Sequence, residues 1–145
     1  MKNQINLANC VFAIHAVLAQ SRAMSIDKAL LVYPLVYQKP MLSKLANKNN
    51  STLSLEKIII GNPEWFSNFD NIFYNNLALS INAIQYMHEM EHVEIENGII
   101  ILKKEINYDK QMGEEVKKYY SSSTCISNLL NKPSDYLYLN LRISL

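Results

Sequence analysis

The segment that most restricts how this chain can fold is the run ALLVYPLVY, residues 29–37, which is apolar on nearly every side. Helical periodicity predicts a helix from Ile26 to about Tyr37 that contains this run. A helix that is apolar all round is normally buried, either in the core of its own chain or against another chain. Because proline removes a helix hydrogen bond and clashes with the preceding turn, we expect Pro34 to kink the helix or break it near Leu31. The fold must therefore cover this segment or present it to a partner.

The whole chain, residues 1–145, is expected to form a single soluble domain. A chain of this length can bury about 70% of its unfolded surface, and a content of 49% hydrophobic and 19% charged residues is typical of folded proteins. The formal net charge of +1 argues against attraction of the whole molecule to nucleic acid or to an anionic membrane. No stretch approaches the ~18 continuous apolar residues of a membrane span. We therefore expect a cytoplasmic protein without a membrane partner, in which Cys10 and Cys125 are buried, reduced thiols.

The order of the sequence patterns places helices first and strands late. Helical patterns cover residues from about 7 to 90, and another helical region follows from about 110 to 130. Between them, Asn97-Gly98 separates two alternating runs, which predicts a β-hairpin over about 92–106 because both residues tolerate the positive φ of a type I′ turn. Alternating apolar residues from about 136 to 145 predict a half-buried C-terminal strand that pairs with this hairpin. The expected fold is α+β and mostly helical, with a small antiparallel sheet.

The motif HEMEH, residues 88–92, matches H-E-x-x-H and points to one specific chemistry. On a helix, His88 and His92 would share one face and could hold a zinc ion while Glu89 activates a water molecule. However, His92 falls at or beyond the expected helix end, and no third ligand is evident downstream. The competing interpretation is a polar helix end, where a histidinium is favoured near the negative pole of the helix dipole. We adopt this interpretation and keep a zinc metallohydrolase as a remote alternative.

No other stretch of the sequence supports catalysis or cofactor binding. The sequence contains no G-x-S-x-G and no P-loop, and its three glycines leave little room for a backbone cradle around a phosphate. We therefore expect a non-enzymatic protein without catalytic residues, metal ligands or cofactors.

Several segments together resemble one protein family in their order and composition. They are NLANCVFAIHAVL, IDKALLVYPLVYQKP, STLSLEKIIIGNPEWFSNF and LSINAIQYM, followed by the Asn-Gly hairpin and the closing YLYLNLRISL. This order resembles the middle component of three-component ABC systems, which are bacterial conflict loci. LLVYPLVYQKP and NPEWF are the most specific pieces, and the pieces together span nearly the whole chain.

The resemblance implies an accessory, non-enzymatic subunit. Such a subunit would act as an adaptor between an SMC-like ABC ATPase and a third, effector component in anti-phage or anti-plasmid defence, and DNA would be reached through the complex. A helical domain with a late hairpin also looks like a winged helix, a fold that SMC-associated subunits often use. The alternative function is a DNA-binding winged-helix regulator that contacts duplex DNA in a salt-dependent way through lysines near the hairpin, such as Lys103 and Lys104.

The apolar helix and the residues that follow it form the predicted partner interface. An aromatic rim with hydrogen-bonding groups is typical of interface hot spots, and the segment supplies one in its tyrosines and the polar residues beside them. The predicted interface residues are Leu31, Tyr33, Pro34, Tyr37, Gln38, Lys39 and Pro40. The alternative is that the segment is simply the central core helix. The C-terminal strand offers a second route, since an open edge can accept a strand from a partner, although its plain interpretation is an ordinary edge strand.

Overall fold

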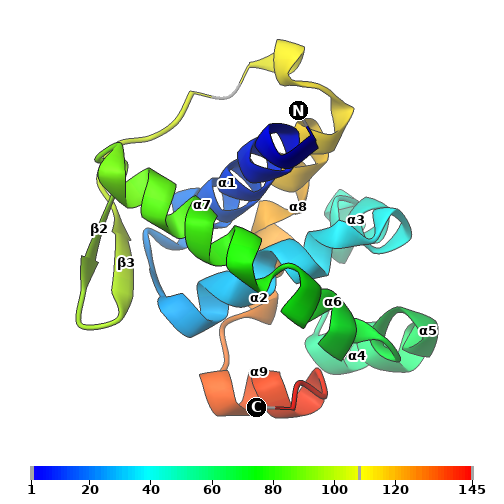
Figure 1. Cartoon of the computed structure of the whole chain (residues 1–145). Helices are drawn as coiled ribbons and strands as arrows, with labels where there is room; N and C mark the ends of the chain where they lie inside the picture. Colours follow the sequence, from blue (N-terminus) through cyan, green and yellow to red (C-terminus); the bar gives the residue numbers. More distant parts are fainter. Residues whose placement is uncertain (1, 108, 145) are drawn as a thin grey trace.

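The protein is described by a computed structural model that covers residues 2–107 and 109–144 (Figure 1). Helices make up most of it, which confirms the predicted mostly helical α+β class. No helix in these residues is both long enough and apolar enough to cross a bilayer. In chain order the elements are α1 (Lys2–Ser21), β1 (Ala23–Ser25), α2 (Ile26–Tyr37), α3 (Lys39–Leu45), η1 (Lys48–Asn50), α4 (Leu55–Gly61), α5 (Pro63–Phe66), α6 (Phe69–Asn75), α7 (Leu77–Glu89), β2 (Val93–Glu96), β3 (Ile99–Leu102), η2 (Lys110–Met112), α8 (Glu114–Leu129) and α9 (Ser134–Asn140).

The hydrophobic core forms around α1 and α2, which pack against each other and against α7; α1 also packs along α8. The apolar run of α2 is covered by the chain itself, because every residue from Leu31 to Val36 is buried. The helix continues without interruption through Pro34 to Tyr37, so the predicted break near Leu31 does not occur. A proline removes only one helix hydrogen bond, and the burial of apolar side chains around the whole helix offsets that loss.

The sheet in the described part of the chain has three antiparallel strands in the order β1-β3-β2. The predicted hairpin is confirmed, with β2 and β3 joined at Asn97 and Gly98, whose φ angles of 53° and 77° suit a type I′ turn. The third strand is β1, which lies between α1 and α2 in sequence and pairs Met24 with Ile100 of the central strand. Figure 1 shows the hairpin projecting from one side of the helical body, beyond the end of α7.

The C-terminal segment is helical, so the strand predicted over about 136–145 is wrong for the residues that the structure describes. Leu137, Tyr138 and Leu141 are buried whereas Leu139 is 78% exposed, which is the periodicity of a helix and not the two-residue alternation of a strand. The Tyr138 hydroxyl donates to the Asp27 carbonyl oxygen at 2.6 Å and ties α9 to the start of α2. The C-terminal strand was expected to pair with the hairpin, but in the described residues the strand added to the hairpin is β1.

Candidate protein–protein interface

The HEMEH motif does not place its two histidines on one helix face. The helix α7 ends at Glu89, and the chain turns at Glu91, which has a φ of 63°. His88 is exposed in the last helical turn, whereas His92 lies beyond the turn with its Nδ1 atom 3.2 Å from the Lys104 carbonyl oxygen. No group of three or more His, Cys, Asp or Glu side chains that could hold a metal occurs among the described residues. The motif therefore lies at the end of α7 and in the turn that follows. His88 and His92 are not together on one helix, as zinc binding by this motif requires.

The third histidine, His15, is buried in α1 and bonded through both ring nitrogens. Its Nε2 atom accepts a hydrogen bond from the Ile106 backbone N–H at 3.0 Å, so Nδ1 carries the proton and faces the Tyr120 hydroxyl at 2.7 Å. Burial lowers the pKa of His15, while the charge of Glu105 acts to raise this pKa and His92 acts to lower it. Its observed contacts tie α1 to α8 and to the segment that follows β3, which is a structural role.

Both cysteines are buried and free, as the sequence predicted. Burial raises the pKa of the Cys10 thiol to about 12 and that of Cys125 to about 11. The thiolate is the nucleophilic form of cysteine, and at neutral pH these two thiols stay protonated. They therefore act as small apolar core residues.

The predicted interface divides into a buried part and an exposed part. Leu31, Tyr33 and Pro34 lie inside the core of the chain. Tyr37 is 52% exposed at the end of α2. Gln38 is half-buried, and Lys39 and Pro40 are exposed at the start of α3. The structure thus brings the residues from Tyr37 to Pro40 to the surface at the junction of α2 and α3. The buried residues Leu31, Tyr33 and Pro34 hold α2 in place.

The α2–α3 junction is held by specific contacts that also add a residue to the surface. Gln38 is extended, with φ −85° and ψ 120°, and ends α2. Its side-chain Nε2 donates to the Trp65 carbonyl oxygen at 2.8 Å, which places α5 beside the junction. The Tyr37 ring meets Tyr33 edge-on with centroids 6.1 Å apart, and the Lys44 ammonium lies 5.8 Å from the centre of the Trp65 ring. We call Tyr37, Gln38, Lys39, Pro40 and Trp65 the corner surface.

Sequence reasoning missed Trp65 as a member of this surface. Its signal was present in NPEWF, one of the most specific pieces of the family resemblance, but that piece is separated from Tyr37 by more than twenty residues. The Gln38–Trp65 hydrogen bond is the contact that joins them, and it depends on how α3, α4 and α5 fold back along the chain. Trp65 is partly buried, so the aromatic group is fixed in position and still available at the surface.

Beyond the corner surface, α3 approaches the start of α8 and the two carry charges of both signs. Lys39, Glu114, Glu115 and Lys118 line a shallow hollow there together with Leu42. The Lys118 ammonium donates to the Ser43 hydroxyl at 3.0 Å and fixes α3 against α8. This mixture of charges suits the polar rim of a protein interface.

The lysines near the hairpin, which the DNA-binding alternative would use, lie among acidic residues. The Lys103 ammonium forms an ion pair with Glu94 at 3.0 Å, and both side chains are more than half exposed. Arg22 similarly pairs with Glu105 at 2.9 Å. Direct DNA binding by this surface stays an untested prediction.

Comparison with known proteins identifies the chain at the level of its family. Residues 2–144 match the family described as ABC-three component (ABC-3C) system Middle Component 3. No curated protein and no solved structure matches the chain. The match covers nearly the entire sequence and agrees with the predicted resemblance to a middle component. The chain therefore belongs to the Middle Component 3 family of ABC-three component systems.

Proposed function

We propose that this protein is a non-enzymatic adaptor subunit that links an SMC-like ABC ATPase to an effector component in a bacterial anti-phage or anti-plasmid defence complex. Its family is one component of a system with several parts, so the chain has other proteins to engage. In this proposal the protein is cytoplasmic, and its association with DNA occurs through the complex.

The observation that carries the proposal is the corner surface. Tyrosine and tryptophan at an exposed site provide large contact areas with polar groups, and these residue types are enriched in hot spots. The corner keeps them in a fixed geometry, since Tyr37 packs on the buried Tyr33 and Gln38 binds the backbone of Trp65. Side chains that are already ordered lose less conformational entropy when a partner covers them. Such a surface supports binding of another protein more directly than it supports chemistry.

Co-expression with the ABC ATPase and the third component of the same system, followed by affinity capture through this chain, tests the proposal. We expect the wild-type chain to retain at least one of the two proteins at physiological salt. Tyr37→Ala should weaken this capture at least tenfold, whereas Tyr86→Ala, which removes a 44% exposed tyrosine from α7, should have little effect. A wild-type chain that stays monomeric in the presence of both proteins would contradict the proposed function.

A further inference from the structure

The two edges of the small sheet differ in how they are protected. At the β2 edge, Glu94 and Glu96 are exposed, and charged side chains of this kind discourage the addition of a further strand. The β1 edge consists of Ala23, Met24 and Ser25 and carries no charge of its own. Only one edge of the sheet is therefore guarded against pairing with another chain.

The register of β1 leaves backbone groups pointing away from the sheet. Leu102 N–H donates to the Arg22 carbonyl at 3.0 Å, and Ile26 N–H donates to the Gly98 carbonyl at 2.9 Å. These bonds place residues 22, 24 and 26 in the positions that bond to β3. By the alternation of an antiparallel pair, the N–H and C=O of Ala23 and the N–H of Ser25 face the open side. Backbone groups of this kind bind water or a further strand.

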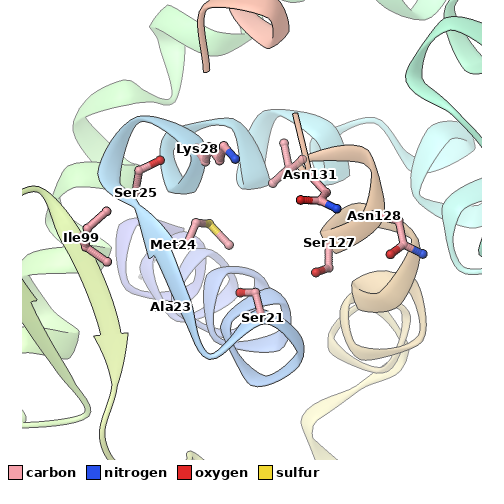
Figure 2. Close-up of a pocket in the computed structure, with 10 residues that line it drawn as sticks. Ser21, Ala23, Met24, Ser25, Lys28, Ile99, Ser127, Asn128 and Asn131 are labelled. Carbon is pink, nitrogen blue, oxygen red and sulfur yellow. The ribbon is translucent and has the colours of Figure 1, made fainter. Parts of the chain in front are cut away.

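A polar groove of about 480 Å³ lies beside this open edge. Figure 2 shows β1 and the start of α2 on one side, the end of α8 with Ser127 and Asn131 on the other, and Met24 reaching into the space between them. Asn128 is already bonded to the Ser51 carbonyl oxygen at 2.8 Å. Within the described residues, the side chains of Ser127 and Asn131 form no hydrogen bond and remain open to a ligand. The groove thus offers a row of backbone groups on one wall and polar side chains on the opposite wall.

The charge of the groove favours one kind of occupant. Lys28 is the one charged residue among the described residues that line the groove. The neighbouring Asp27 lines a different hollow, with Ser134, Asp135 and Tyr138, and its carboxylate accepts from the Ser25 hydroxyl and the Lys28 backbone N–H. An acidic side chain in the groove would therefore meet a positive charge.

We propose that an extended segment of a partner protein, carrying an acidic residue, adds to β1 as a fourth strand in this groove. Main-chain hydrogen bonds to Ala23 and Ser25 would hold the segment, and its acidic side chain would face Lys28. This inference rests on the proposed function, because the partner is taken to be another component of the same system. It assigns a recognition surface separate from the corner surface.

Two variants, Ser25→Pro and Ser25→Ala, distinguish the loss of the backbone N–H needed for strand addition from the loss of the Ser25 hydroxyl. Ser25 has φ −65° and ψ 151°, which proline adopts without strain, and the preceding Met24 is in an extended strand as proline requires. S25P removes the outward N–H, whereas S25A keeps this N–H, and both variants lose the hydroxyl bond to Asp27. We expect capture of the ABC ATPase or the third component to fall at least tenfold for S25P and less than twofold for S25A. Thermal unfolding midpoints within a few degrees of wild type would show that both variants fold.

Hydrogen exchange on the wild-type complex supplies a second readout. The amides of Ala23 and Ser25 should become protected when the other components bind, and Lys28→Glu should weaken capture severalfold. Loss of all capture by the wild-type chain would overturn the proposed function and this inference together. A wild-type complex that S25P leaves intact, with no added protection at Ala23 and Ser25, would overturn the inference alone. A wild-type chain that dimerises through this edge, or a duplex DNA that protects it, would also overturn the inference.

Discussion

The two ends of α2 present surfaces of different kinds. At the N-terminal end, the open backbone of β1 lies beside a polar groove whose one charged residue among those described is Lys28. At the C-terminal end, the corner surface offers aromatic and amide side chains on Tyr37, Gln38 and Trp65. A helix of this length separates them by roughly 18 Å. One end is suited to a partner in extended conformation, and the other is suited to a partner with a complementary side-chain surface.

This difference shows what the apolar middle of α2 contributes. Its buried residues offer nothing to a partner directly, but they fix both ends of the helix relative to each other. The apolar segment therefore connects the two proposed surfaces through the core of the chain. The two proposed surfaces have no residue in common.

The largest expected effect is a loss of stability when the buried middle of α2 is altered. Leu31 is fully buried, so Leu31→Ala should lower the free energy of unfolding by about 3 kcal/mol through lost burial and a residual cavity. Urea denaturation measures the change, and capture through both surfaces should decline with the fraction of unfolded protein. Ile60→Ala is the matched control, because Ile60 is 80% exposed and its truncation should change stability by less than about 0.5 kcal/mol. Equal stability of L31A and wild type would contradict the role assigned to α2.

The second prediction concerns binding affinity and tests whether the chain has one binding surface or two. Tyr37→Ala should cost about 2 kcal/mol of binding free energy, or roughly thirtyfold in affinity, with little loss of stability because the side chain is half exposed. Binding titrations of Y37A, S25P and the double variant with purified partner proteins measure whether the two losses add. Additive losses are expected for sites this far apart. A strong departure from additivity would show that the groove and the corner surface are coupled.

A smaller loss of stability should affect only the N-terminal end of α2, which lies beside the groove. Tyr138→Phe removes the hydroxyl that donates to the Asp27 carbonyl oxygen, and loss of such a hydrogen bond costs about 1 kcal/mol. Hydrogen exchange should become faster around α9 and the start of α2 and stay unchanged at the corner surface. Tyr86→Phe, at an exposed position on α7, provides the control. Faster exchange at both ends of α2 would indicate that the two surfaces do not respond independently.

The smallest expected effect is a dependence of folding stability on pH. It should not change the structure of either proposed surface. Burial lowers the pKa of His15 below its ordinary value of 6.5, with Glu105 acting to raise it and His92 acting to lower it. The unfolded chain therefore binds the His15 proton more readily, so this contribution to stability is present above pH 6.5 and is lost as the pH falls through the lower folded-state pKa. Thermal unfolding from about pH 7.5 to about pH 5 measures the loss.

His15→Gln is the control for this pH dependence. Glutamine can accept the Ile106 N–H through its amide oxygen but does not titrate, so the unfolding midpoint of H15Q should vary less with pH than that of wild type. Identical pH profiles for the two proteins would show that other groups cause the acid sensitivity.

Local sequence signals determined several features of this protein correctly. Asn97-Gly98 forms the predicted hairpin turn. The apolar run of α2 is helical and buried. Each of these outcomes depends on the conformational preference of one or two residues or on a continuous apolar pattern, which a single stretch of chain carries by itself.

Only the tertiary structure decided which segment completes the sheet and which residues form the surfaces. The spacing of Leu137 and Leu141 fits a strand and a helix equally well. In the structure both side chains are buried at the α9 end of the chain, and β3 pairs with the three residues of β1 instead. Trp65 joined the corner surface through a contact with Gln38 that spans 27 positions. Strand pairing and surface assembly depend on contacts between distant segments, and a short pattern is compatible with more than one such arrangement. The amino-acid sequence thus determined what must be buried, and packing between distant segments decided which side chains remained exposed.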